Sequence, residues 1–139
     1  MSTLTDYSDL ENEIADAQEP QALPKGTEVE FRIISVNSGI SDKNGCRWFN
    51  VVMDVPDEPL AKAFSDFFWD LDKTKLDLKQ FANNLFKFKT FAGAIDLDYT
   101  VPFNWEEDLI GKTGNAILGY KVDDEYGPKN TVSKYVAVR

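Results

Sequence analysis

The chain contains no histidine, only one cysteine and no long apolar run, and each absence excludes a class of function. Without histidine there is no imidazole general base, no Ser-His or Cys-His nucleophile and no histidine metal ligand. With Cys46 alone, the chain forms neither an internal disulfide nor a thiolate zinc site. The N-terminus has no signal-peptide pattern and no segment is long enough to cross a bilayer, so we expect a soluble cytoplasmic protein.

The charge is concentrated at one end of the chain. The 139 residues fit one globular domain, and 24 acidic against 15 basic side chains give a net charge of −9. Residues 1–24 hold six acids and no Lys or Arg, whereas residues 25–139 hold 18 acids and all 15 bases and so carry −3. We predict a flexible acidic arm over residues 1–24, with a short helix near residues 9–17, and a folded domain over residues 25–139. The arm is either a solubility tail or a segment that docks on a partner or masks the domain.

Five segments have the composition of strands, and most of them alternate apolar and polar residues. They cover residues 27–36, 46–55, 64–71, 113–122 and 130–138. One helix is predicted between the third and fourth strands, because Asp77 and Gln80 form a capping-box pattern and Gly93 is a suitable C-terminal cap.

The order of these elements predicts a mainly β protein. A strand, strand, strand, helix, strand, strand order is that of the OB-fold, a five-stranded Greek-key barrel. We therefore expect an OB-fold-like five-stranded antiparallel barrel with one helix between strands 3 and 4. An open sheet packed on one helix is the alternative.

No catalytic motif is recognisable in the sequence. The acidic runs at residues 106–108 and 123–125 lack a neighbouring His or Cys and do not have the spacing of a calcium loop. Neither G-x-G-x-x-G nor a P-loop is present. We predict a protein that is not an enzyme and has no metal or cofactor; a metal-assisted enzyme at one of the acidic runs is an alternative.

Aromatic residues are more informative, since the chain has ten Phe, five Tyr and three Trp. Alternation assigns Phe67 to the core but places Trp48 and Phe68 on the polar sides of their strands. If these two strands are neighbours, both rings share one exposed face and can stack on unpaired bases. The alternative is that a bend of the barrel or the arm covers them.

Basic and tyrosine side chains accompany these rings near the predicted loops. In an OB-fold those loops flank the nucleic-acid groove, where Lys and Arg contact phosphates. Together with Trp48 and Phe68, the predicted nucleic-acid-binding residues are Lys43, Arg47, Lys121, Tyr126, Lys129, Lys134 and Tyr135.

Several short motifs resemble those of a family of small phage-encoded proteins. They are FFW at residues 67–69 before the helix, WEEDLIG at 105–111, TGNAILGY at 113–120 and DEYGPKN at 124–130. Proteins of this family occur in replication and recombination gene clusters and are associated with single-stranded DNA binding through an OB-fold. The resemblance implies an aromatic and basic groove and a location in the phage-infected bacterial cytoplasm. This chain departs from such proteins in lacking an acidic C-terminal tail, since its sequence ends YVAVR.

We thus expect a non-enzymatic single-stranded-DNA-binding protein, with the acidic arm as a contact for replication or recombination proteins. Monomer and homodimer both remain open. The alternative function is an acidic interaction module or DNA mimic that inhibits a nucleic-acid enzyme by occupying its basic groove.

Overall fold

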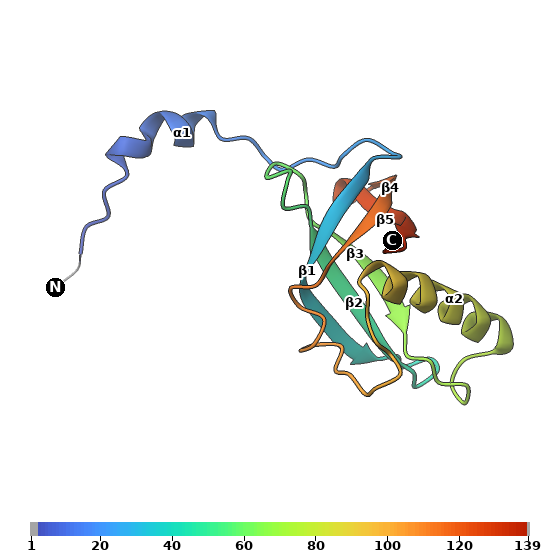
Figure 1. Cartoon of the computed structure of the whole chain (residues 1–139). Helices are drawn as coiled ribbons and strands as arrows, with labels where there is room; N and C mark the ends of the chain where they lie inside the picture. The colour runs from blue at the N-terminus through green and yellow to red at the C-terminus, as the bar shows by residue number, and fades with distance from the viewer. Residues whose placement is uncertain (1–2, 139) are drawn as a thin grey trace.

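The computed structural model describes residues 3–138, and its principal element is one five-stranded antiparallel sheet. The strands lie in the order β3-β2-β1-β4-β5 (Figure 1). Their bounds are β1 (Glu28–Ile40), β2 (Arg47–Asp54), β3 (Phe64–Trp69), β4 (Thr113–Asp123) and β5 (Gly127–Val136). A mainly β chain with five antiparallel strands and a helix between the third and fourth strands is therefore confirmed.

The long strand β1 joins the two halves of the sheet. Its first part, through Arg32, pairs with β4, and from Arg32 onward it pairs with β2, with an irregularity between Ile33 and Ser35. The outer strands β3 and β5 share no ladder within residues 3–138, but their side chains meet: the Tyr135 hydroxyl donates to Asp66 Oδ2 at 2.6 Å. The sheet thus curls far enough to bring its two edges together.

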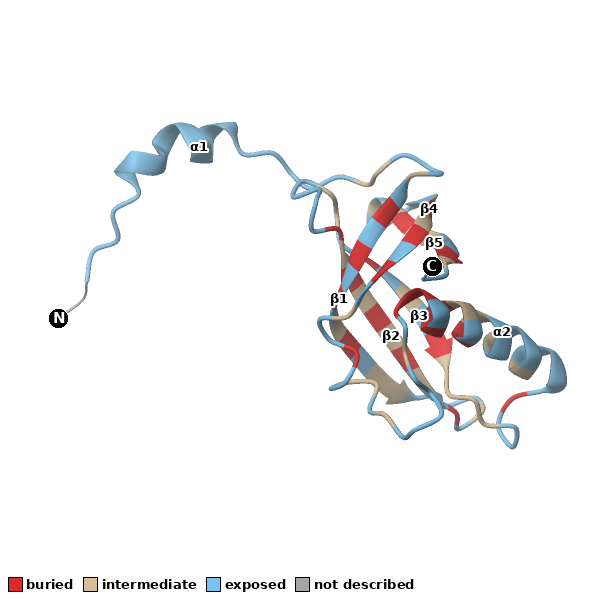
Figure 2. Ribbon diagram, in the orientation of Figure 1, coloured by how far each residue is buried: buried red, intermediate tan, exposed pale blue. Residues whose placement is uncertain are grey.

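Alternation along the strands produces the core, as the striped colouring of β1 and β2 shows (Figure 2). Alternate residues of β2 form its buried face: Phe49, Val51 and Met53 are each no more than 1% exposed. The loop before β4 contributes the Trp105 ring, which stacks on Phe49 with centroids 4.3 Å apart and planes 6° apart. A segment without regular periodicity therefore completes the core.

Helix α2 (Leu78–Ala94) begins as predicted and ends later than predicted. Asp77 and Gln80 form the expected capping box, with the Gln80 N–H donating to Asp77 at 2.8 Å. Gly93 lies inside the helix, so its assignment as C-terminal cap was wrong; the residue with left-handed φ is Asp96. Only the C-terminal half of α2 is buried in the core, through Phe88, Phe91, Ala92 and Ala94.

The arm contains a 3-10 turn, η1 (Ser8–Leu10), followed by α1 (Glu11–Asp16). The predicted short helix is confirmed. Both elements are exposed along their whole length and extend away from the body (Figure 2). Among the helices and strands of residues 3–138, α1 contacts only η1.

Hydrogen bonds attach the end of the arm to the body at residues 21–23. The Gln21 N–H donates to the Leu60 carbonyl, and the Lys62 N–H donates to the Gln21 carbonyl, each at 2.8 Å. On the other side, the Asn130 amide both accepts from the Leu23 N–H and donates to the Leu23 carbonyl at 2.8 Å. The attached part of the chain thus starts at Gln21, four residues before the boundary predicted at residue 25.

Within residues 3–138, no helix combines the length and the apolar character needed to span a membrane.

Candidate nucleic-acid interface

Three aromatic rings lie together on the outer face of β2 and β3, the face directed away from the core. Trp48 pairs with Trp69 across the two strands, and Asn50 pairs with Phe67. The Trp48 and Phe67 rings stack at 5.9 Å between centroids with an interplanar angle of 25°, and Phe67 meets Trp69 edge-on at 5.0 Å. Phe67 is 39% exposed, and both tryptophans are half-buried. We call Trp48, Phe67 and Trp69 the outer aromatic cluster.

Gly39 sets the position of the Trp48 ring. Gly39 is the β1 partner of Trp48, and the indole lies directly against its backbone. A Cβ atom on Gly39 would lie 2.5 Å from Trp48 Cζ2, which is inside any real contact distance. The absence of a side chain on β1 therefore lets the indole lie on the sheet, where its exposed side can receive another planar group.

A groove of about 390 Å³ adjoins this cluster. It runs between the outer face of β2–β3 and the hairpin that connects β4 to β5. The residues lining it include two lysines and no Asp or Glu, although the chain carries a net charge of −9. Its walls include Asn50, Val52, Lys62, Ser65, Tyr126 and Lys129. Asn50 is the cross-strand partner of Phe67, so the groove and the outer aromatic cluster form one continuous surface.

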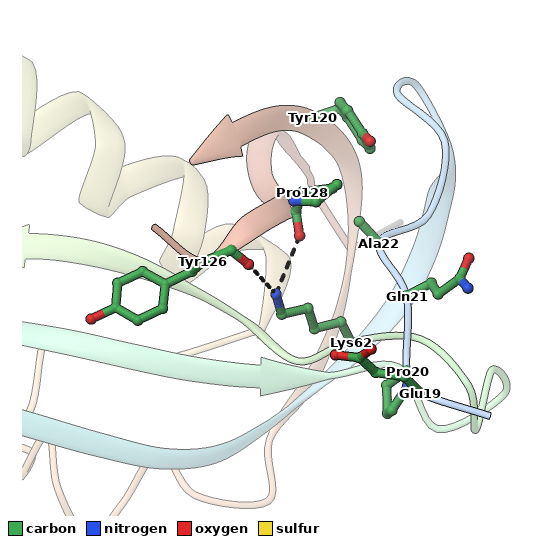
Figure 3. A pocket seen from close by; sticks show the side chains of 8 residues that line it. All are labelled: Glu19, Pro20, Gln21, Ala22, Lys62, Tyr120, Tyr126 and Pro128. Atoms are coloured by element: carbon green, nitrogen blue, oxygen red, sulfur yellow. Dashed lines mark hydrogen bonds between the residues drawn. The ribbon is translucent and has the colours of Figure 1, made fainter. Parts of the chain in front are cut away.

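Lys62 holds the hairpin beside the groove. Its ammonium group donates to the carbonyl oxygens of Tyr126 and Pro128 at 3.3 Å each (Figure 3). Lys62 and Tyr126 also line a neighbouring hollow of about 250 Å³, whose other wall includes Glu19 and Gln21 at the end of the arm. The arm therefore meets the body next to one end of the groove.

A polar cluster joins β3, β5 and α2 on the inner side of the sheet. Asp66 Oδ1 pairs with Lys87 Nζ at 2.8 Å, while its Oδ2 accepts from the Tyr135 hydroxyl. Lys87 also donates to the Phe67 carbonyl and lies 4.7 Å above the Phe68 ring. Burial, together with the adjacent Asp66 carboxylate, raises the pKa of Tyr135 well above its ordinary value. These contacts hold β3, and with it the backbone of Phe67, against β5 and α2.

Two of the predicted binding residues point into the core. Phe68 is 1% exposed and packs on Phe91 and Trp105, so the expectation that it is exposed was wrong. The reason is Asp66, which shares the face of Phe68: an acid normally marks the solvent side of a strand, but this carboxylate is turned inward to Tyr135 and Lys87. Tyr135 is 7% exposed, so its predicted role at the interface is also wrong.

Arg47 and Lys134 are exposed but lie elsewhere. Arg47 pairs with Glu106 at 2.5 Å and lies over the Phe49 ring, on the opposite side of β2 from Trp48. Lys134 lines a separate hollow with Glu28. The structure does not bring these two residues to the outer aromatic cluster.

The remaining predicted residues surround the outer face. Trp48 belongs to the outer aromatic cluster, and Tyr126 and Lys129 line the groove. Lys121 is the cross-strand partner of Lys129, so both side chains lie on the same face of the hairpin. Lys43 is exposed in the turn before β2, at the end of the strand that carries Trp48.

Sequence reasoning missed Phe67, Trp69 and Lys62. Three consecutive aromatic residues do not reveal which side chains of β3 face the core. Asp66 suggested that its own face, which includes Phe68, is the solvent face, and this was wrong. Phe64, which is 4% exposed, is the signal that could have corrected it, since Phe64 and Phe68 are four residues apart and share a face. Nothing in the sequence marks Lys62, because only the fold brings it to the hairpin.

The acidic runs make local structural contacts. Glu106 pairs with Arg47 and also accepts from the Ser38 hydroxyl at 2.7 Å. Asp123 accepts from the N–H groups of Tyr126 and Glu125, and these bonds lower the pKa of its carboxyl. Within residues 3–138, no group of three or more His, Cys, Asp or Glu side chains is arranged to hold a metal ion.

A scan against protein-family models finds none that matches this chain, and a search of curated proteins finds no matching sequence.

Proposed function

We propose that this protein binds single-stranded DNA without sequence preference along the outer face of β2 and β3. The observation that carries the proposal is the outer aromatic cluster beside a groove with two lysines and no carboxylate in an otherwise acidic chain. Exposed aromatic rings offer planar surfaces to unpaired bases, whereas bases in a duplex are already stacked on each other. Single strands are therefore the form of nucleic acid that this surface suits.

The two parts of the surface have separate roles in this proposal. Trp48 and Phe67 stack on bases, and each stacked base contributes about 1–3 kcal/mol. Lys129 and Lys62 attract the phosphates, with Lys43 and Lys121 at the margins. Because the groove bears only two lysines, we expect moderate affinity and a shallow dependence on salt.

The proposed fold is an OB-fold-like barrel. Its support is the strand order β3-β2-β1-β4-β5 together with the side-chain contact between the two edge strands. In OB-folds the outer face of strands 2 and 3 and the loops between strands 1 and 2 and between strands 4 and 5 bind oligonucleotides. The outer aromatic cluster and the groove occupy the corresponding positions here.

The setting we propose is replication or recombination of a phage genome in the bacterial cytoplasm. It rests on the motifs WEEDLIG, TGNAILGY and DEYGPKN and their resemblance to phage single-strand binders. In that setting the protein has no catalytic role; it protects unpaired strands.

The test is a titration of a labelled oligo(dT) of about 30 bases, followed by fluorescence anisotropy at low and at raised salt. We expect binding that weakens as salt rises. Trp48→Ala and Phe67→Ala should each weaken binding about 5- to 150-fold, the equivalent of one stacked base. Absence of binding at low salt would refute the proposal.

Ile110→Ala is the matched control, because Ile110 is an apolar side chain, 50% exposed, in the loop before β4. It should leave oligo(dT) affinity unchanged. A DNA mimic, by contrast, would ignore oligo(dT), bind a basic protein and lose that binding when residues 1–20 are deleted. The same deletion should preserve or strengthen strand binding if our proposal is correct, because it removes negative charge from one end of the groove.

A further inference from the structure

The arm carries an apolar stripe that the body does not cover. Tyr7, Leu10 and Ile14 are three and four residues apart, so they share one face of the η1–α1 segment. They are 63%, 43% and 56% exposed, respectively. A helix as short as α1, with six residues, is marginal in water unless its apolar side packs against something. The arm therefore has the form of a segment that docks.

Helix α2 borders an apolar groove, whereas the arm carries an apolar stripe. Its N-terminal half extends beyond the core and borders an apolar groove of about 410 Å³. Leu85 and Phe86 line this groove and are 47% and 66% exposed, with Tyr99 opposite them at 56%. Such a patch on a surface helix is a common site for an amphipathic helix.

The charges of the two surfaces are complementary. Residues 1–24 hold six acids and no base, whereas α2 holds three lysines and no acid. Lys79, Phe86 and Lys89 are seven and three residues apart, so the two exposed lysines lie on the Phe86 side of the helix at either end of the apolar patch. An acidic amphipathic segment fits a site of this pattern.

The tether decides which copy supplies the arm. From Asp16, where α1 ends, to Gln21, where the chain is hydrogen-bonded to the body, the chain spans at most about 18 Å. Helix α1 projects away from the body, on the side of the molecule remote from α2 (Figure 1). We propose that the arm of one copy docks its Tyr7–Leu10–Ile14 stripe in the α2 groove of a second copy. This contact goes beyond DNA binding, since neither surface includes a residue of the outer aromatic cluster or of the lysine-lined groove.

The experiment is disulfide trapping between two variants without DNA. A chain with Ile14→Cys is mixed with a distinguishably tagged chain that carries Phe86→Cys; native Cys46 is buried and does not compete. We expect the mixed disulfide to form at least about tenfold faster than with a Val122→Cys partner, whose β4 position is 62% exposed but outside the α2 groove. All three substituted side chains are exposed, so the variants should fold.

Charge reversal on α2 provides a second, independent test. Lys79→Glu with Lys89→Glu in the Phe86→Cys chain should slow trapping at least about fivefold, and raised salt should do the same. Equal rates for the Phe86→Cys and Val122→Cys partners would overturn the proposal. A chain with both Ile14→Cys and Phe86→Cys that closes an internal disulfide on dilution would also overturn it, because the arm would then reach its own α2.

Discussion

Strands β2 and β3 carry aromatic rings on both faces, and the two sets are built differently. On the inner face Phe49 and Phe68 pack against Trp105 with centroids 4.3 and 5.5 Å away, and both phenylalanines are 1% exposed. On the outer face Trp48 and Phe67 also stack, yet Phe67 remains 39% exposed. The same two strands thus hold one set of rings that water cannot reach and another that it can.

The difference separates stability from binding. A buried ring stabilises the fold through the apolar area removed from water and through close packing. An exposed ring contributes only part of that free energy to the stability of the fold, and its flat apolar surface remains available to a partner. Substitutions of neighbouring residues, Phe67 and Phe68, should therefore affect different measurements.

The largest effect is expected from Phe68→Ala. Loss of a buried phenylalanine leaves a cavity beside Phe91 and Trp105 and should lower the free energy of unfolding by about 3–5 kcal/mol. Phe67→Ala, the matched control one residue away, should cost about 1 kcal/mol or less. Urea denaturation of both variants measures the difference. Equal losses would mean that the two faces do not differ in the way described.

Tyr135→Phe should have the next largest effect, because it removes the hydrogen bond to Asp66. A hydrogen bond to a charged group contributes about 2 kcal/mol. At about pH 7.5 the substitution should therefore lower the free energy of unfolding by that amount. The pKa of Tyr135 is raised in the folded protein, so the unfolded chain ionises first as pH rises past about 10. The stability contributed by the neutral phenol is complete below that pH and falls above it.

Urea midpoints at about pH 7.5 and about pH 10.5 test this dependence. The difference in urea midpoint between wild type and Tyr135→Phe should be smaller at the higher pH, because only the wild type has a phenol at position 135 that can ionise. The other four tyrosines are present in both proteins and cancel. A difference that stays constant with pH would contradict the assignment.

Gly39→Ala sharpens the comparison on the outer face. The added Cβ would meet the Trp48 ring at 2.5 Å and displace it from β1. We expect binding of oligo(dT) to weaken about tenfold, since a misplaced ring loses much of one stacking contact. The urea midpoint should change little because Trp48 is outside the core. Gly93→Ala, in open space on α2, is the glycine control and should leave binding unchanged.

Lys129→Gln should have the smallest effect. Removing one phosphate contact should weaken binding a few-fold at low salt and reduce the slope of log affinity against log salt by about 0.7. Lys25→Gln, a substitution of an exposed lysine before β1, is the control. An unchanged slope in Lys129→Gln would remove this lysine from the groove's contact with phosphate.

Regular patterns in the sequence predicted most of the fold. Strand-like composition, with alternation in most segments, located all five strands, and the Asp77–Gln80 capping box located the start of α2. The sequence left open which residues of β3 face the core, because Phe67, Phe68 and Trp69 are all apolar and Asp66 is an acid whose side chain turns inward. Trp105 lies in a segment without periodicity, so its place in the core depends on tertiary packing.

The sequence predicted that the candidate site combines aromatic and basic side chains, but it identified only some of the residues. Alternation alone placed Trp48 on the outer face, and the hairpin pattern brought Tyr126 and Lys129 to one loop. Phe67 and Trp69 were missed because their assignment depended on the facing of β3. The ion pair between Arg47 and Glu106 directs the Arg47 side chain away from the outer aromatic cluster. These two residues are 59 positions apart in the sequence, so no local pattern predicts their contact.

The inward carboxylate of Asp66 also bears on how the chain chooses among alternative folds. If β3 slipped by one residue against β2, Phe67 would enter the core in place of Phe68, and burial of a ring would be conserved. Asp66 would then turn to solvent and leave the Tyr135 hydroxyl and the Lys87 ammonium without their partner. The slip would also exchange buried Phe64 for Ser65, so hydrophobic burial and the polar cluster both oppose it. Asp66 thereby acts together with Phe64 in determining which aromatic rings of β3 face the solvent.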